Sequence, residues 1–217
     1  MIFYATALSS YSAKVRIALV AKGVAFEERE PPGGYRSEAY RAIVPMGTLP
    51  AIDDEGFVLS ESEAILEYLE ERNPAPALLP ADIRARARSR FLSRFHDLYL
   101  EPPARALFAH IHPARRDAEA VARHLELLRG RLRQLEAFCR PAPYALGPAL
   151  SLADCGYAVT LPLARRLAEA LGAPLALPPA LAAWLEALHA HPAVASALAP
   201  WRPATERWLS DASRRTV

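Results

Sequence analysis

Short apolar runs alternate with stretches of helical periodicity over the first third of the chain. Apolar side chains recur on one side of residues 12–22 and of residues 61–72, which predicts amphipathic helices there. In chain order, the predicted elements are a strand at residues 2–5, a helix at 12–22, a strand at 26–30, a short helix at 37–43, a hairpin of 51–52 with 57–59, and a helix at 61–72. This order predicts an α/β domain over residues 1–73.

Beyond residue 81 the hydrophobic positions follow only a helical period, and no further strand pattern is found. Residues 74–81 are rich in proline, lack a clear period and are interpreted as a linker. Beyond them alanine, leucine and arginine dominate, and prolines divide the sequence into about six helices. Residues 82–217 are therefore predicted to form an all-α domain.

Composition narrows the classes of protein that fit this pattern. The 217 residues carry a formal net charge of +2, which gives no general case for binding nucleic acid or an anionic membrane. Cys139 and Cys155 form neither a CxxC pair nor a metal-ligand cluster, so we expect no metal and a reducing, cytoplasmic location. No apolar stretch has the length of a signal peptide core or a membrane span.

A serine-rich turn leads from the first predicted strand into the first predicted helix. It contains Ser9, Ser10, Tyr11 and Ser12. Free backbone N–H groups and the positive end of the helix dipole meet at such a turn, and they lower the pKa of a thiol placed there. A serine hydroxyl could donate a hydrogen bond to the resulting thiolate. The alternative is ordinary helix capping, with Ser12 as the N-cap.

Two further segments suggest contacts with an extended peptide. A cis proline at Pro50, which opens a predicted strand, would direct the backbone of Leu49 outward to pair with such a ligand. A trans proline at the sheet edge is the alternative. Residues 60–63 fit a capping box that makes Ser60 the N-cap. Glu61 could then pair with an ammonium and Ser62 with a carboxylate, although plain capping also explains the motif.

Together these motifs resemble the cytosolic glutathione transferase superfamily, and zeta- and theta-like bacterial serine-type members most of all. Residues 9–19 resemble the zeta-class active-site segment, and residues 45–50 resemble the family's Asn-Pro-x-Gly-x-Val-Pro with Val44 in the Asn place. Glu61 and Ser62 match the pair that binds the γ-glutamyl end of glutathione. Residues 151–154 match the family's helical folding motif and also fit a capping box. The resemblance covers essentially the whole chain.

The resemblance implies a thioredoxin-like N-terminal domain, an all-helical C-terminal domain and a homodimer. It implies that glutathione is the co-substrate and that Ser9 activates its thiol, with Ser10 and Tyr4 as rival activators. Leu49 would bind the cysteinyl backbone of glutathione beside Pro50. Tyr11 would also line the site, in a place where several relatives have a cysteine. The first domain has no cysteine, which disfavours chemistry that needs an enzyme thiol.

The second substrate is expected to be a small electrophile bound between the domains. Its candidate pocket residues are Tyr11, His96, Tyr99 and Arg166, each of which could instead serve packing or the solvated surface. The predicted function is transfer of glutathione to this electrophile. Two alternatives stay open: a glutathione-dependent maleylacetoacetate or maleylpyruvate isomerase, and a non-catalytic glutathione-binding module.

Overall fold

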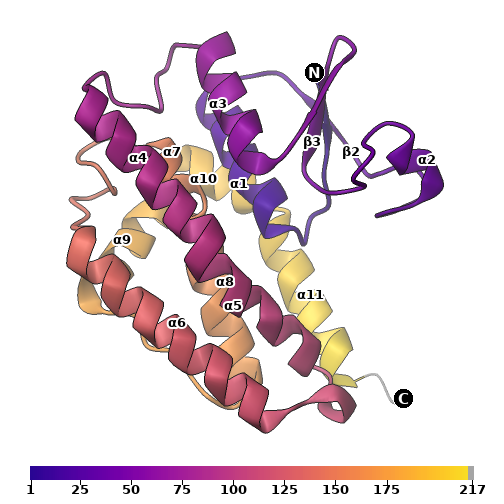
Figure 1. The fold of residues 1–217 in the computed structure, drawn as a ribbon, viewed down its shortest axis with the longest axis vertical. Coiled ribbons are helices and arrows are strands. Elements are labelled where there is room, and N and C mark those ends of the chain that lie inside the picture. The colour runs from indigo at the N-terminus through magenta and orange to yellow at the C-terminus, as the bar shows by residue number, and fades with distance from the viewer. Residues whose placement is uncertain (215–217) are drawn as a thin grey trace.

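A four-stranded mixed sheet forms the centre of the N-terminal part of the chain (Figure 1). The computed structural model describes the backbone of residues 1–214 and the side chains of residues 1–212. The strands are β1 (Ile2–Tyr4), β2 (Glu27–Arg29), β3 (Ala51–Asp54) and β4 (Phe57–Ser60), in the spatial order β2-β1-β3-β4. β1 pairs in parallel with β2 and antiparallel with β3, and Phe3 lies opposite Ile52. The predicted α/β class is confirmed.

Three helices of this part pack around the sheet, and the candidate site lies at the N-terminus of the first of them. They are α1 (Ser10–Ala21), α2 (Glu38–Arg41) and α3 (Ser62–Arg72). α1 begins two residues before the predicted start, because Ser9 rather than Ser12 caps it. β2 is shorter than predicted and all of its residues are exposed, since it forms the edge of the sheet.

The C-terminal part is helical, as predicted, but its helices are more numerous. Its α-helices are α4 (Ile83–Phe95), α5 (Glu101–Ala106), α6 (Ala118–Phe138), α7 (Leu152–Cys155), α8 (Tyr157–Ala170), α9 (Pro179–Ala190), α10 (Pro192–Leu198) and α11 (Trp201–Arg214). A π-helix, η1 (His96–Leu100), joins α4 to α5, and two 3-10 turns, η2 (Leu107–His110) and η3 (Pro113–Arg115), follow α5. Prolines do not mark the helix ends reliably in this part of the chain. Pro179 and Pro192 are the first residues of helices, and Pro162 lies inside one.

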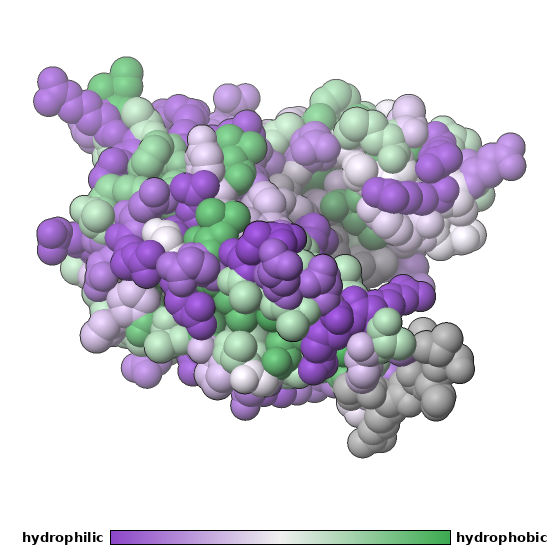
Figure 2. Space-filling model, turned by 60° about the horizontal axis from the view of Figure 1, so that its bottom comes forward, coloured by the Kyte–Doolittle hydropathy of each residue, from purple (hydrophilic) through white to green (hydrophobic). Residues whose placement is uncertain are grey.

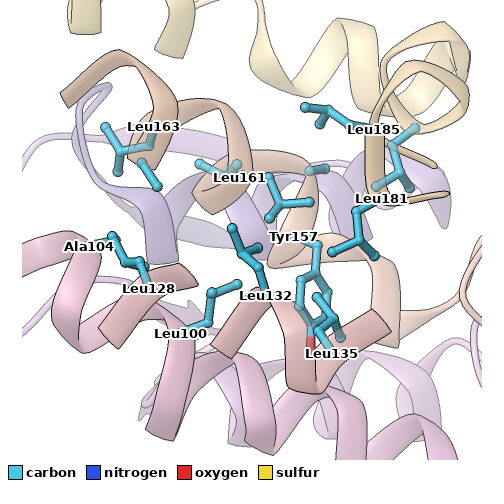
Figure 3. Packing of buried hydrophobic residues seen from close by; sticks show 14 of the residues in the cluster. Leu100, Ala104, Leu128, Leu132, Leu135, Tyr157, Leu161, Leu163, Leu181 and Leu185 are labelled. Carbon is cyan, nitrogen blue, oxygen red and sulfur yellow. The ribbon is translucent and has the colours of Figure 1, made fainter. Parts of the chain in front are cut away.

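The helical core is built from leucines of several helices around Tyr157 (Figure 3). Leu132 and Leu135 of α6 point toward the side chains of α8 and α9, and Leu100 approaches from η1. α7 begins with the predicted capping box, in which Asp154 accepts the backbone N–H of Ser151. Burial raises the pKa of Asp154, although hydrogen bonds from its neighbours oppose that shift.

α1 contributes to the cores of both parts of the chain. Val15 and Leu19 pack into the cluster that contains the sheet and α3. Ala13 and Ile17 instead belong to the helical cluster. All four side chains are fully buried. α1 therefore lies between the sheet and the helical part, with its N-terminus at their junction (Figure 1).

Candidate active site

Ser9 caps the N-terminus of α1 with its side chain. Its Oγ accepts the backbone N–H of Ser12 at 3.1 Å. A hydroxyl group has one hydrogen to donate as well as lone pairs that accept, so this contact leaves the Ser9 hydrogen available. The first turn of α1 contains no acidic side chain that would repel an anion. A half-buried hydroxyl donor thus lies at the positive end of a helix.

Ser10 is buried and faces the helical part of the chain. Its hydroxyl donates a hydrogen bond of 2.6 Å to Oε1 of Glu101, on α5. Nη2 of Arg105 donates to the same Ser10 oxygen at 2.8 Å and to Glu101 Oε1 at 2.5 Å. The single hydrogen of the Ser10 hydroxyl is therefore committed to a carboxylate.

Two tyrosines lie near this turn in different surroundings. The guanidinium of Arg105 lies 5.0 Å from the centre of the Tyr11 ring, within the range of a cation–π contact. Burial, reinforced by the carboxylates of Glu101 and Asp97, raises the pKa of Tyr11 and keeps its hydroxyl protonated. Tyr4, the last residue of β1, is only 6% exposed and packs against Tyr40 of α2, which weakens its case as a thiol activator.

The Leu49–Pro50 peptide bond is cis rather than trans, the form that the family resemblance implied, and leads directly into β3. Pro50 is buried and Leu49 half-buried. Within the described part of the chain, no hydrogen bond engages the backbone of Leu49. An unpaired backbone beside a sheet can accept an added extended segment.

The predicted capping box at the start of α3 is wrong. Ser60 is the last residue of β4, and Glu61 occupies the N-cap position without a side-chain capping bond. The carboxylate of Glu63 instead pairs with the buried ammonium of Lys14 and accepts a hydrogen bond from the hydroxyl of Ser93. Glu61 itself is exposed and has a φ of 75°, a region that non-glycine residues rarely adopt. Ser62 begins the helix and is buried.

The candidate pocket residues fall into different environments. His96 is 2% exposed, and both of its ring nitrogens bind protein groups, so it does not line an open surface. Tyr99 is exposed, and its ring lies under the guanidinium of Arg131. Arg166 is half-buried on α8 and binds Glu206 through two nitrogens, and Glu169 as well. Two carboxylates therefore already neutralise its charge.

Two residues that were not predicted from the sequence lie beside Ser10 and Tyr11: Glu101 and Arg105. Glu101 and Arg105 come from α5, some ninety positions away, and no motif marks them. The only sequence signal for Glu101 and Arg105 is their spacing of four residues, which places them on one helical face and allows an ion pair.

Within the residues that the structure describes, neither a metal site nor a membrane span is found. Among residues 1–212, no group of three or more His, Cys, Asp and Glu side chains could hold a metal ion. No helix in the described part is both long and apolar enough to cross a bilayer. Cys139 and Cys155 are buried free thiols, and burial raises the pKa of each.

Comparison with known proteins identifies the family. The family model for the N-terminal domain of glutathione S-transferases matches residues 3–77, and that for their C-terminal domain matches residues 116–187. A glutathione S-transferase from Pseudomonas putida is 33% identical over 168 residues, which cover 75% of this chain and 74% of that protein. The chain belongs to the glutathione S-transferase family and is a glutathione-dependent enzyme, as its motifs predicted.

Isomerases are also among the similar proteins. A maleylacetoacetate isomerase from Pseudomonas aeruginosa is 46% identical over 93 residues, covering 40% of this chain and 43% of that protein. The structure of a maleyl pyruvate isomerase, described as a bacterial glutathione S-transferase of the zeta class, is 30% identical with a TM-score of 0.79. That alignment covers 94% of this chain and 99% of the other.

Proposed function

We propose that this enzyme transfers glutathione to a small electrophile and that the Ser9 hydroxyl stabilises the glutathione thiolate. One observation carries the choice of serine. The Ser10 hydrogen is donated to Glu101, whereas Ser9 only accepts from Ser12 and retains its own hydrogen. The Ser9 oxygen is also polarised by the N–H that it accepts, which makes its hydrogen a better donor.

The reaction begins with loss of the thiol proton to solvent, and the helix N-terminus and the Ser9 hydroxyl stabilise the anion that remains. The thiolate sulfur then attacks an electrophilic carbon. A carbon–sulfur bond forms, and the leaving group departs with its bonding electron pair. Catalysis arises from proximity and from stabilisation of the thiolate, and no group on the enzyme changes its covalent state.

Three backbone and side-chain features would hold glutathione in this orientation. The free backbone of Leu49 beside Pro50 would pair with the cysteinyl residue as an added strand does. Ser62 would receive the γ-glutamyl carboxylate at the N-terminus of α3. The exposed carboxylate of Glu61 would pair with the neighbouring ammonium. Together these contacts would direct the sulfur toward the first turn of α1.

The electrophile would bind over the same turn. We place Tyr11 and Arg105 at its edge, because the half-exposed guanidinium and the protonated phenol face the junction of the two parts. Tyr99 stays a candidate for the electrophile pocket. We leave out His96 because it is buried, and Arg166 because its charge is already paired.

The structure of the complex with glutathione tests this proposal. We expect the sulfur within hydrogen-bond distance of Ser9 Oγ and beyond that distance from Ser10 Oγ. A sulfur on Ser10, with the bond from Ser10 to Glu101 broken, would contradict it. Retention on immobilised glutathione tests binding, and turnover of a small electrophile with glutathione separates an enzyme from a non-catalytic glutathione-binding module.

A second candidate is a glutathione-dependent isomerase of maleylacetoacetate or maleylpyruvate. The likeness to the maleyl pyruvate isomerase structure over nearly the whole chain favours it. The thiolate would add to the carbon–carbon double bond, the resulting single bond would rotate, and the thiolate would leave with its electrons to restore the double bond. Turnover of either substrate with catalytic glutathione supports this function, and its absence excludes it.

A homodimer in the cytoplasm completes the proposal. Large hydrophobic side chains are exposed on α4, η1 and α6, of which η1 contacts both other helices: Phe91, Leu98, Tyr99 and Leu127. Figure 2 shows another view of the surface, where hydrophobic residues lie in small groups between hydrophilic ones. Light scattering at several concentrations tests the dimer, and Phe91→Glu should yield a monomer because it charges the proposed interface.

A further inference from the structure

A buried ring of polar groups connects the first turn of α1 to α5, α8 and η1. Glu101 accepts from Ser10 through Oε1 and from the hydroxyl of Thr160 through Oε2, at 2.6 and 2.7 Å. Thr160 Oγ1 lies 2.7 Å from Nε2 of His96. Ser10, Glu101, Thr160 and His96 are each at most 4% exposed.

The ring closes on α1 through Asp97. Nδ1 of His96 lies 2.6 Å from Oδ1 of Asp97, and the Lys14 ammonium donates to both Asp97 oxygens at 2.9 Å. Lys14 is one helical turn after Ser10, so α1 is fixed to the helical part at two points. Glu63 of α3 binds the other side of Lys14.

The hydrogen positions in this ring follow from the donors and acceptors available. Thr160 has one hydroxyl hydrogen and gives it to the Glu101 carboxylate. The Thr160 oxygen can then only accept from His96, so Nε2 carries a hydrogen. Burial alone would raise the pKa of Asp97, but hydrogen bonds from His96 and Lys14 hold it below its usual range. Asp97 is thus an anion, and Nδ1 must also donate to it.

We propose that His96 is a buried imidazolium and that, through Thr160, it fixes Glu101 as the acceptor that turns the Ser10 hydroxyl away from the glutathione sulfur. His96, Thr160 and Glu101 are positioning residues in this scheme, which rests on the proposed role of Ser9. The charges of the cluster then balance: Lys14, His96 and Arg105 are positive, and Glu63, Asp97 and Glu101 are negative. Tyr157, whose ring meets that of His96 edge-on, adds no charge.

Two substitutions separate this role from simple packing. Thr160→Val keeps the volume but cuts the link, which leaves the Glu101 carboxylate less compensated beside the thiol site. The pKa of bound glutathione should rise by about one unit, a tenfold drop in its ionisation constant. Glu101→Gln keeps the bond from Ser10 but removes the negative charge, so the same pKa should fall. Thr160→Ser is the control and should restore the unaltered value.

The test uses the ultraviolet absorbance of bound glutathione thiolate as a function of pH, together with the glutathione Kd of each variant. Opposite shifts from Thr160→Val and Glu101→Gln, with each Kd changed less than about twofold, support the proposal. Shifts in one direction, or none, overturn it. A structural defect alone would weaken binding and would move both variants alike.

Nitrogen-15 NMR of His96 tests the proton count without glutathione. We expect both ring nitrogens protonated in the unaltered protein and one proton lost in Glu101→Gln, because the Gln amide can donate to Thr160 and Thr160 then donates to Nε2. A neutral ring in the unaltered protein overturns the proposal. Absence of glutathione binding by the unaltered protein would instead overturn the proposed function and leave this NMR result to stand separately.

Discussion

The hydroxyl of Ser10 donates a 2.6 Å hydrogen bond to Glu101, which lies 91 residues further along the chain. Ser9, its neighbour, caps α1 and keeps its own hydrogen. Two serines that look equivalent in the sequence therefore have different partners. The difference is set by α5, an element of the other part of the chain.

Substitution of the two serines should separate their roles. Ser9→Ala should raise the pKa of bound glutathione and slow turnover about tenfold to a hundredfold, since a hydrogen bond to a charged group contributes about 1.5–3 kcal/mol. Glutathione binding should persist. Steady-state kinetics and thiolate absorbance measure both effects, and Ser9→Thr, which keeps a capping hydroxyl, is the control.

Ser10→Ala should show the reverse pattern. Loss of the donor to buried Glu101 should lower the free energy of unfolding by about 1–3 kcal/mol, while the pKa of bound glutathione should rise by no more than the one unit or so expected of Thr160→Val. Urea denaturation measures the stability. If Ser10→Ala abolished thiolate formation and Ser9→Ala did not, the assignment of Ser9 would be wrong.

Glu61 should show a conflict between stability and binding. Its φ of 75° is unfavourable for a residue with a Cβ, and such strain costs on the order of 1–3 kcal/mol. Glu61→Gly should therefore raise the melting temperature but weaken glutathione binding, because the carboxylate is lost. Glu61→Gln retains the strain and serves as the control. Calorimetry gives both quantities, and unchanged binding in Glu61→Gly would exclude this residue from the glutathione site.

Asp97 should make stability dependent on pH. Its pKa is lowered in the folded protein, so the stabilisation is present above the ordinary aspartate pKa of about 3.9 and is lost as the pH falls through the lowered value. Asp97→Asn should destabilise the neutral protein by about 3 kcal/mol, because Lys14 and His96 lose their shared anion. Denaturation at several pH values should show the two proteins converging in acid; a gap independent of pH would refute this.

Gly156 is predicted to be intolerant of any side chain. A Cβ there would lie 2.6 Å from Nδ1 of His96, so Gly156→Ala must displace a buried ring and should cost about 1–3 kcal/mol. Gly130, in the middle of α6, has its nearest atom at 3.8 Å. Gly130→Ala should stabilise the protein by up to about 1 kcal/mol, since alanine is the better helix former. Equal effects of the two substitutions in thermal denaturation would contradict this packing.

The sequence predicted what local chemistry determines. The hydrophobic period placed the strands and longer helices, and the motifs indicated the cis bond at Pro50 and the capping box at Ser151. The capping box predicted at Ser60 is not formed, since the Glu63 side chain binds Lys14, which lies 49 positions away in the sequence. His96 was assigned to a pocket because a sequence does not show burial. Glu101 and Thr160 could not be found, since only tertiary packing brings them to Ser10.

α1 has a side in each of the two cores, and this limits how the protein can be divided. The family has separate models for its two domains, as if the two halves were modules to be exchanged between relatives. Yet Ala13 and Ile17 of the first module belong to the interior of the second. A chimera with a foreign helical half must therefore match that face of α1 as well as supply acceptors for Ser10 and Lys14. Halves can therefore be exchanged only between relatives that share both the α1 face and these acceptors.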